Sequence, residues 1–208
     1  MNKGIIIVLA LVLLLGGATF LYGTLSTEIA PEQLAEMQTQ EVSKPEAPMQ
    51  EETDQAAELP EESNAAANKL AAPDFTVYDA AGNAVCLSDF FGKPIVLNFW
   101  ASWCGPCCGE MPEFDEKYRE LGSEVQFIML NMTVGRETKE SADKFLAEQD
   151  FAFPVYFDLN ADAAYTYGAS TLPVTFFIDA EGYLTAQAVG RINGETLQRG
   201  IDMIYSAE

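Results

Sequence analysis

The chain has 208 residues, and its 11 Lys and Arg stand against 32 Asp and Glu, which gives a formal net charge of −21 at pH 7. This acid excess argues against nucleic-acid binding and against docking on anionic lipid headgroups, because both need clustered Lys and Arg. The sequence contains no His, which excludes Ser-His-Asp and Cys-His catalysis, His-ligated zinc or copper and axial-His haem, and leaves four Cys as the candidates for chemistry.

The first predicted element is an apolar run over residues 5–22, interrupted only by two Gly and one Thr. A helix of this length measures roughly 27 Å, just enough to span the hydrocarbon core of a bilayer. Lys3 precedes the run and the first charge after it is Glu28, which favours a cytoplasmic N-terminus and export of the remainder. We expect residues 1–23 to form a single uncleaved signal anchor in the cell membrane. A cleaved signal peptide is the alternative, and it exports the same domain.

Residues 24–72 have a different composition, with 11 acidic residues, two Lys and four Pro, and without any aromatic residue, Gly or Cys. Such a segment buries too little apolar surface to offset the entropy of ordering it. Like charges should also keep it extended. The composition predicts a disordered acidic linker that acts as a spacer.

The aromatic residues return from residue 73 onward, and about 136 residues are enough for one domain with its own core. The patterns predict a hairpin of residues 75–78 and 84–87, strands at 95–100, 125–131 and 154–157, helices at 105–121, 137–149 and 161–167, a hairpin of residues 174–178 and 184–189, and a closing helix at 194–205. Strands that alternate with helices and end in a hairpin predict an α/β domain with a central mixed sheet covered on both faces.

The strongest chemical signal is Cys104-Gly105-Pro106-Cys107, where a buried strand passes into a helix. Cys104 falls at the helix N-terminus, where unpaired N–H groups and the helix dipole stabilise a thiolate and lower the pKa of the thiol below about 8.5. Cys107 lies one turn further, should be more buried, and should stay protonated until it resolves a mixed disulfide. The pattern predicts a dithiol in which Cys104 is the attacking group.

A zinc site is the alternative, because a CxxC pair also builds half of one. Its four ligands would have to be Cys86, Cys104, Cys107 and Cys108, of which the adjacent last two make poor joint ligands. Haem attachment of the c type needs His after the second Cys, where this chain has Cys108. We therefore expect no resident metal and no cofactor.

A second feature is Pro173, immediately before the strand predicted at residues 174–178. Proline is tolerated at a strand start because the ladder needs no donor there. A cis bond before it would place the Leu172 backbone beside the dithiol, ready to pair with an extended peptide that carries a substrate Cys. A trans bond is the alternative, since most X-Pro bonds are trans.

These motifs resemble those of the thioredoxin superfamily, and specifically of the membrane-anchored TlpA/ResA-like thiol-disulfide oxidoreductases. The matching stretches are IVLNFWASWCGPC at 95–107, EMP at 110–112 and LPVTFFID at 172–179, and the resemblance covers essentially all of residues 73–208. Where thioredoxins carry a buried Asp, this chain has Asn98, and ResA-like proteins also have Asn there.

The resemblance implies a thioredoxin-like fold with an N-terminal β-hairpin extension, a redox-active Cys104–Cys107 pair and a cis Pro173. We expect the substrate to contact four residues beside these groups, which are Trp103, Gly105, Pro106 and Leu172. Trp103 should also pack beside the dithiol and shield Cys107 from water.

ResA-like proteins carry a Glu three residues after the second Cys, which is Glu110 here. Cys107 must lose a proton when it resolves a mixed disulfide, and a nearby carboxylate of raised pKa can accept that proton. Glu110 lies one helical turn from Cys107 on the same face, and the chain has no His. We expect it to be this base, with a solvated glutamate in a surface ion pair as the alternative. Pro112 should kink the same helix.

The remaining thiols depart from the family pattern or lie far from it. Cys108 is predicted to point away from the dithiol as a spectator, with an alternate resolving or regulatory role left open. Cys86 is most simply a small buried apolar residue. A disulfide between the two is a further alternative.

These observations together predict a membrane-tethered, extracytoplasmic thiol-disulfide oxidoreductase that mainly reduces disulfides in exported proteins. The resemblance implies a transmembrane thiol donor of the CcdA type and apocytochrome c among the family's clients. Gly-Pro between the cysteines resembles the reducing thioredoxins. The alternatives are a disulfide-forming oxidant of the same fold, a non-catalytic thiol- or metal-binding module, and a peroxidase, for which the expected cysteine surroundings are lacking.

Overall fold

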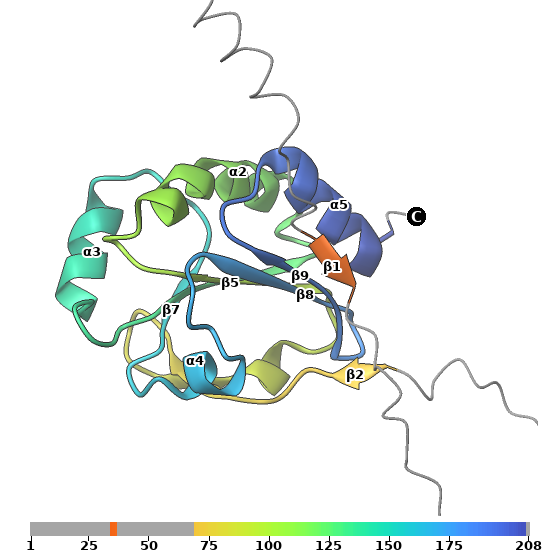
Figure 1. Ribbon diagram of the computed structural model, residues 1–208, viewed down its shortest axis with the longest axis horizontal. Coiled ribbons are helices and arrows are strands. Elements are labelled where there is room, and N and C mark those ends of the chain that lie inside the picture. The colour runs from red at the N-terminus through yellow and green to blue at the C-terminus, as the bar shows by residue number, and fades with distance from the viewer. Residues whose placement is uncertain (1–33, 37–68, 207–208) are drawn as a thin grey trace, which may run out of the picture. The chain divides into compact units, whose positions relative to one another are not determined.

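The computed structural model describes residues 34–36 and 69–206, whose strands form one mixed sheet in the order β1-β9-β8-β5-β6-β7-β3-β4, with β2 also paired to β9 (Figure 1). The strands are β1 (Leu34–Glu36), β2 (Leu70–Ala71), β3 (Thr76–Tyr78), β4 (Ala84–Cys86), β5 (Ile95–Trp100), β6 (Gln126–Asn131), β7 (Val155–Phe157), β8 (Val174–Ile178) and β9 (Tyr183–Val189). The helices are the 3₁₀ helix η1 (Leu87–Phe90), α2 (Gly105–Leu121), α3 (Lys139–Ala147), α4 (Asp162–Thr166) and α5 (Gly194–Ile204).

The centre of the sheet combines both kinds of strand pairing. β5 runs parallel to β6, and β6 runs parallel to β7. On the other side of β5, β8 is antiparallel to it, and β9 is antiparallel to β8. The predicted central mixed sheet and its closing hairpin are therefore confirmed, and so is the β3–β4 hairpin, which joins the sheet through β7.

Two apolar cores lie on the two faces of the sheet, because successive side chains of a strand point to opposite faces. On β5, Val96 and Trp100 face the core under α2 and α5, whereas Ile95, Leu97 and Phe99 face the core on the side of α4. All five side chains are fully buried. A strand buried on both faces explains why this segment reads as a continuous apolar run.

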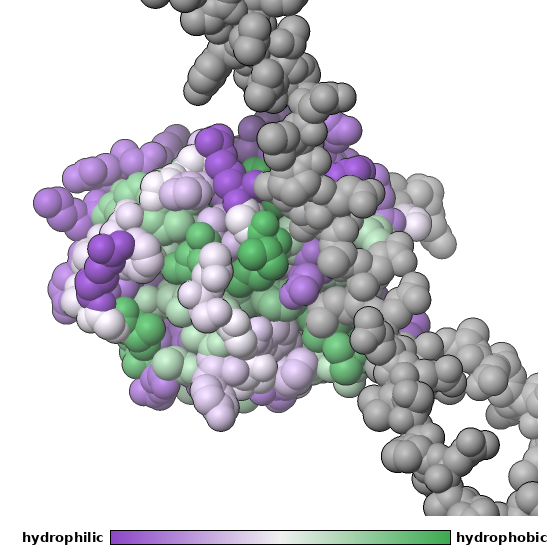
Figure 2. Space-filling model, viewed as in Figure 1, coloured by the Kyte–Doolittle hydropathy of each residue, from purple (hydrophilic) through white to green (hydrophobic). Residues whose placement is uncertain are grey.

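The helices that cover the sheet present hydrophilic residues to solvent and pack closely on the strands. In the view of Figure 2, hydrophilic residues dominate the margin where α2 and α3 lie, and hydrophobic residues surface in separate patches. The α5 helix packs so closely on the sheet that a Cβ at Gly200 would overlap the ring of Phe177. Helices of this kind cover the sheet with one face and meet water with the other.

The structure differs from the predicted elements at several boundaries. Cys86 is followed by η1 rather than by more strand, because Asp89 accepts a hydrogen bond from the Cys86 N–H at 2.8 Å and starts a helical turn. The helix predicted from residue 137 begins at Lys139, with Thr138 as its N-cap. β2 pairs with β9, so the domain begins before residue 73.

The N-terminal predictions concern residues that the structure mostly leaves undescribed. The signal anchor predicted at residues 1–23 lies outside the described residues, as does most of the linker predicted at residues 24–72. Within that linker, β1 is a strand paired with β9 through its backbone, where disorder was predicted. Among residues 34–36 and 69–206, no helix has the length and apolar character needed to cross a membrane.

Candidate active site

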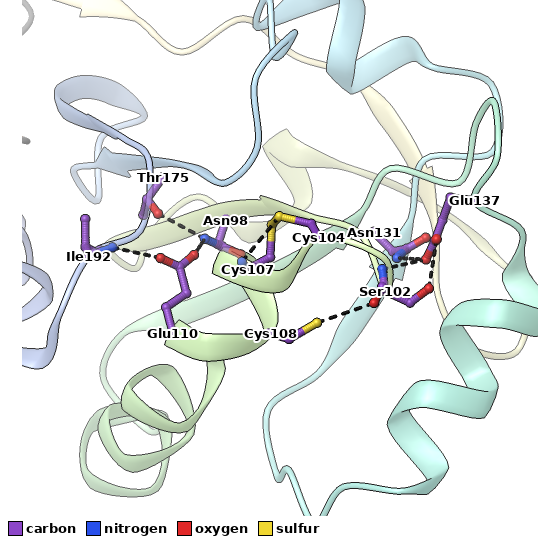
Figure 3. Close-up of a disulfide and its surroundings, with 10 residues drawn as sticks. All are labelled: Asn98, Ser102, Cys104, Cys107, Cys108, Glu110, Asn131, Glu137, Thr175 and Ile192. Atoms are coloured by element: carbon purple, nitrogen blue, oxygen red, sulfur yellow. Dashed lines mark hydrogen bonds between the residues drawn. A yellow bond between two sulfur atoms is a disulfide. The ribbon is translucent and has the colours of Figure 1, made fainter.

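The two cysteines of the CxxC motif form a disulfide at the start of α2, with an S–S distance of 2.04 Å (Figure 3). Cys104 is the N-cap of the helix, and its Sγ accepts a hydrogen bond from the Cys107 N–H at 3.3 Å. Pro106 fits the first turn, where its missing N–H would have no helical partner. Cys104 is 5% exposed and Cys107 is fully buried, as predicted from their places in the helix. Cys104 is thus the more accessible residue of the two.

The peptide bond between Leu172 and Pro173 is cis, as the resemblance implied. Pro173 is buried and Leu172 is half-buried at the start of β8. The carbonyl of Pro173 accepts a hydrogen bond from the Gly190 N–H at 2.9 Å, which ties this segment to the end of β9.

Glu110 is a fully buried carboxylate on α2, three residues after Cys107. Its Oε1 accepts a hydrogen bond from Asn98 Nδ2 at 2.9 Å, and its Oε2 accepts one from the Ile192 N–H at 2.9 Å. Asn98 Nδ2 also donates to Thr175 Oγ1 at 3.0 Å. β5, β8 and the segment after β9 therefore fix the carboxylate beside the dithiol (Figure 3). The alternative of a solvated surface glutamate is wrong.

Burial raises the pKa of Glu110 from 4.5 to about 7, against the hydrogen bonds from Ile192 and Asn98 and the positive charge of Arg191, which lower it. Arg191 lies over the same turn of α2, where its Nη2 donates to the carbonyl of Gly109 at 2.9 Å. A carboxylate with a pKa near 7 changes its charge in the range where a general base is most useful. The direction of this shift is the one that the expected proton transfer requires.

The raised pKa of Glu110 predicts how stability changes with pH. Between pH 4.5 and about 7 the folded protein holds a proton on Glu110 that the unfolded chain has lost, so the free energy of unfolding falls as pH rises through this window. The full loss is about 3 kcal/mol, at 1.36 kcal/mol per pKa unit. Denaturant unfolding of the oxidised protein at pH 5 and pH 8 should show most of this loss, and Glu110→Gln should remove it. Identical pH dependence in both proteins would contradict the assignment.

A second buried carboxylate, Glu137, lies on the other side of the disulfide in the view of Figure 3 and was not predicted. It is 3% exposed and accepts hydrogen bonds from the N–H and the hydroxyl of Ser102 and from Asn131 Nδ2, each at 2.9 Å. Nothing in the sequence separates Glu137 from the other glutamates, because its partners come from β6 and from the loop before Cys104.

The two remaining cysteines are free thiols, so the alternative of a disulfide between them is wrong. Cys108 directs its Sγ toward the carbonyl of Ser102, at 3.4 Å, and away from the disulfide, as expected for a spectator (Figure 3). Burial raises the pKa of the Cys108 thiol, and the charge of Glu137 adds to the effect. Cys86 lies half-buried on β4, with its Sγ 3.7 Å from Thr76 Oγ1.

The residues predicted to contact substrate come from the residue before Cys104, the start of α2 and the segment before β8. Gly105 and Pro106 are exposed in the first turn of α2, and Leu172 precedes the cis bond. Trp103 was expected to cover Cys107, but its side chain is 47% exposed and its ring lies against the Arg136 guanidinium, 3.7 Å from the ring centroid. Cys107 is instead buried within the apolar core under α2. Pro112 lies inside α2, as predicted.

Comparisons with known proteins agree with this site. Residues 69–187 match the family model described as the AhpC/TSA family. The thiol-disulfide oxidoreductase ResA of Bacillus thuringiensis subsp. konkukian (strain 97-27) is 38% identical over 136 residues, which are 64% of this chain and 76% of that protein. ResA of Geobacillus kaustophilus (strain HTA426) is 36% identical over 146 residues, which are 69% of this chain and 81% of that protein.

A solved structure shows the same fold. The crystal structure of the exposed lipoprotein thioredoxin of Streptococcus pneumoniae strain TIGR4 matches with a TM-score of 0.56 and 28% identity, over 62% of this chain and 98% of that chain. The family model, the sequence relatives and the disulfide at the start of α2 agree with one another. The chain therefore belongs to the AhpC/TSA family of thioredoxin-like proteins and is, like its ResA relatives, a thiol-disulfide oxidoreductase.

Proposed function

We propose that this oxidoreductase is tethered to the cell membrane, faces the extracytoplasmic side and reduces disulfides in exported proteins. The observation that carries the chemistry is the Cys104–Cys107 disulfide at the start of α2, with the fully buried Glu110 one turn behind it. Gly and Pro between the cysteines, as in reducing thioredoxins, favour reduction of the client over oxidation.

In the proposed reaction the reduced enzyme gives two electrons to a client disulfide. The Cys104 thiolate attacks one client sulfur, and the client's other sulfur leaves as a thiolate that takes up a proton from water. Glu110 then accepts the proton of the Cys107 thiol, and the Cys107 thiolate attacks Cys104. The second client sulfur leaves as a thiolate that takes up a proton from water, Glu110 returns its proton to water, and the enzyme is left with the Cys104–Cys107 disulfide seen in the structure.

The site supports binding of an extended client segment. Trp103, Gly105 and Pro106 are exposed around Cys104, and the backbone of Leu172 lies at the start of β8. An extended segment that pairs with this backbone would bring a client sulfur to Cys104, while side chains on either side would set specificity.

The location and the partners of the enzyme rest on the sequence and the relatives. The apolar run at residues 5–22, preceded by Lys3, supports a membrane anchor with an exported domain. As electron donor and client we propose a transmembrane thiol carrier of the CcdA type and apocytochrome c, on the resemblance of the motifs at 95–107, 110–112 and 172–179 to ResA-like proteins. The pneumococcal relative is named as an exposed lipoprotein, which also supports an extracytoplasmic domain.

Redox titration tests the direction of electron flow. The full chain, equilibrated in dithiothreitol buffers, should give a reduction potential for the Cys104–Cys107 pair well below that of strong oxidants, for which about −120 mV is typical. A value near −150 mV or higher would overturn the reducing role and favour the disulfide-forming alternative. Labelling of Cys104 in intact, reductant-treated cells by a membrane-impermeant maleimide tests the location, and protection until lysis would contradict it.

A further inference from the structure

Two loops meet beside the disulfide at three points. The loop between β6 and α3, residues 132–138, begins with Met132, whose N–H donates to the Trp100 carbonyl at 2.9 Å. The carboxylate of Glu137 binds Ser102, and the Arg136 guanidinium lies against the Trp103 ring. All three contacts fall on residues 100–103, from the last residue of β5 to the residue before Cys104.

The contact of Glu137 has the most hydrogen bonds of the three. One carboxylate oxygen accepts both the Ser102 N–H and the amide of Asn131, and the other accepts the Ser102 hydroxyl, each at 2.9 Å. Thr133 Oγ1 in turn donates to Asn131 Oδ1 at 3.0 Å. A carboxylate that is 3% exposed needs such donors, because a buried charge without them is costly. Charge-assisted hydrogen bonds are also the stronger ones and fix geometry.

Ser102 passes this constraint on to the cysteines. The Ser102 carbonyl accepts a hydrogen bond from the Cys108 thiol at 3.4 Å. The carbonyl of the neighbouring Ala101 accepts one from the Cys104 N–H at 3.1 Å. The Cys108 N–H donates to the Cys104 carbonyl at 3.0 Å, which closes the first turn of α2. Displacement of Ser102 would therefore displace the backbone on both sides of Cys104.

The contact of Arg136 lies on the outer side of the same loop. Arg136 and Trp103 are both exposed, and the guanidinium is 3.7 Å from the ring centroid. A guanidinium at this distance is attracted by the ring and restricts the rotamers of both side chains. The pair thus places a positive charge beside the residue before Cys104, on a protein that is strongly acidic.

We propose that Arg136 and Glu137 form a clamp that acts on Cys104 as a pair of positioning residues, Glu137 through Ser102 and Arg136 through Trp103. The proposal rests on the proposed role of Cys104 as the attacking thiol. The clamp holds the sulfur at the helix start after the disulfide has been reduced, when the covalent bond to Cys107 no longer does so. Its two opposite charges also act on the thiolate with opposite sign.

The titratable and charged groups near the start of α2 come from three parts of the fold. On the helix itself are Cys107, Cys108 and Glu110, the loop after β6 contributes Arg136 and Glu137, and Arg191 follows β9. The charge of Glu137 already raises the pKa of Cys108, so its field reaches the first turn of the helix. Removal of each clamp charge should consequently shift the titration of Cys104 in a direction set by its sign.

The test measures the pH midpoint of Cys104 alkylation in the reduced full chain, with fragment-ion mass spectrometry to separate Cys104 from its neighbours. Glu137→Gln should lower the midpoint and Arg136→Gln should raise it, each by about half a pH unit. Arg136→Lys keeps the charge and should leave the midpoint in place. Above the midpoint, where Cys104 is fully ionised, Glu137→Gln should lower kcat for a disulfide peptide about tenfold with little change in KM.

Matched variants separate this proposal from others. Glu140→Gln removes an exposed charge three residues away and should change neither midpoint nor kcat. Should Glu137→Gln fail to fold, Ser102→Ala removes only the hydroxyl contact and should still lower kcat, by about threefold. Unchanged midpoints and kcat in folded clamp variants would overturn the clamp. Wild-type protein that never exchanges disulfides would instead overturn the role of Cys104.

Discussion

Replacement of Cys107 by Ala is expected to stop the reaction at the mixed disulfide between Cys104 and the client. Cys104 is the N-cap of α2 and the more exposed residue of the pair, so it keeps its ability to attack. The fully buried Cys107 is the thiol that would release the client, and no other thiol points at Cys104, since the Cys108 sulfur is hydrogen-bonded to Ser102. Turnover should fall at least about a thousandfold, because the two cysteines act as one unit and losing either costs nearly the whole rate.

Non-reducing electrophoresis and mass spectrometry of the trapped adduct measure this outcome and identify the client. Cys104→Ser should give no adduct and no turnover. Cys86→Ala, a change at a half-buried thiol on β4, should leave both unchanged. Continued turnover in Cys107→Ala would show that Cys107 is not the resolving thiol. Accumulation of the mixed disulfide in Cys108→Ala would show the same.

Glu110→Gln should slow disulfide exchange by about a hundredfold at pH 7.5, within the range for loss of a positioned general base. Gln keeps the size of the side chain and can still accept the Ile192 N–H through its carbonyl oxygen, but it cannot take a proton from Cys107. Because the pKa of Glu110 is about 7, the wild-type resolution rate should rise with pH through this value. The variant should lack this rise.

Stopped-flow resolution of a preformed mixed disulfide across pH 5.5 to 9 is the measurement, since it isolates the step in which Cys107 is deprotonated. Glu116→Gln is the matched control, because Glu116 is exposed on the same helix. A Glu110→Gln profile that retains both the rate and the inflection near pH 7 would remove Glu110 from the proton transfer.

Much of the site could be predicted because its elements are local in sequence. The CxxC pair lies at a strand-to-helix junction, which places one sulfur at a helix N-terminus whatever the tertiary details. The one-turn spacing of Cys107 and Glu110 likewise follows from helical geometry. The structure adds that Glu110 is buried because α2 packs on the sheet, with Asn98 and Ile192 supplying its donors.

The clamp could not be predicted because it depends on contacts between loops. Glu137 reads as an ordinary acidic residue at the start of a predicted helix, and only the fold brings it to Ser102. The position of Trp103 was mispredicted for the same reason: its partner Arg136 is distant in sequence. Strand β1 was also missed, since its pairing with β9 is made by backbone groups that any composition can supply.

One short stretch after β9 joins two parts of the site. The Gly190 N–H donates a hydrogen bond to the Pro173 carbonyl, and the Ile192 N–H donates one to Glu110. Asn193 is the N-cap of α5. A peptide laid along the segment before β8 and a proton on Glu110 thus draw on the same rigid support. If docking of a peptide changes the proton affinity of Glu110 by some factor, protonation of Glu110 must change the affinity for the peptide by the same factor. The pH outside the protein would then set both the dissociation rate of a bound client and the rate at which the reduced client is released.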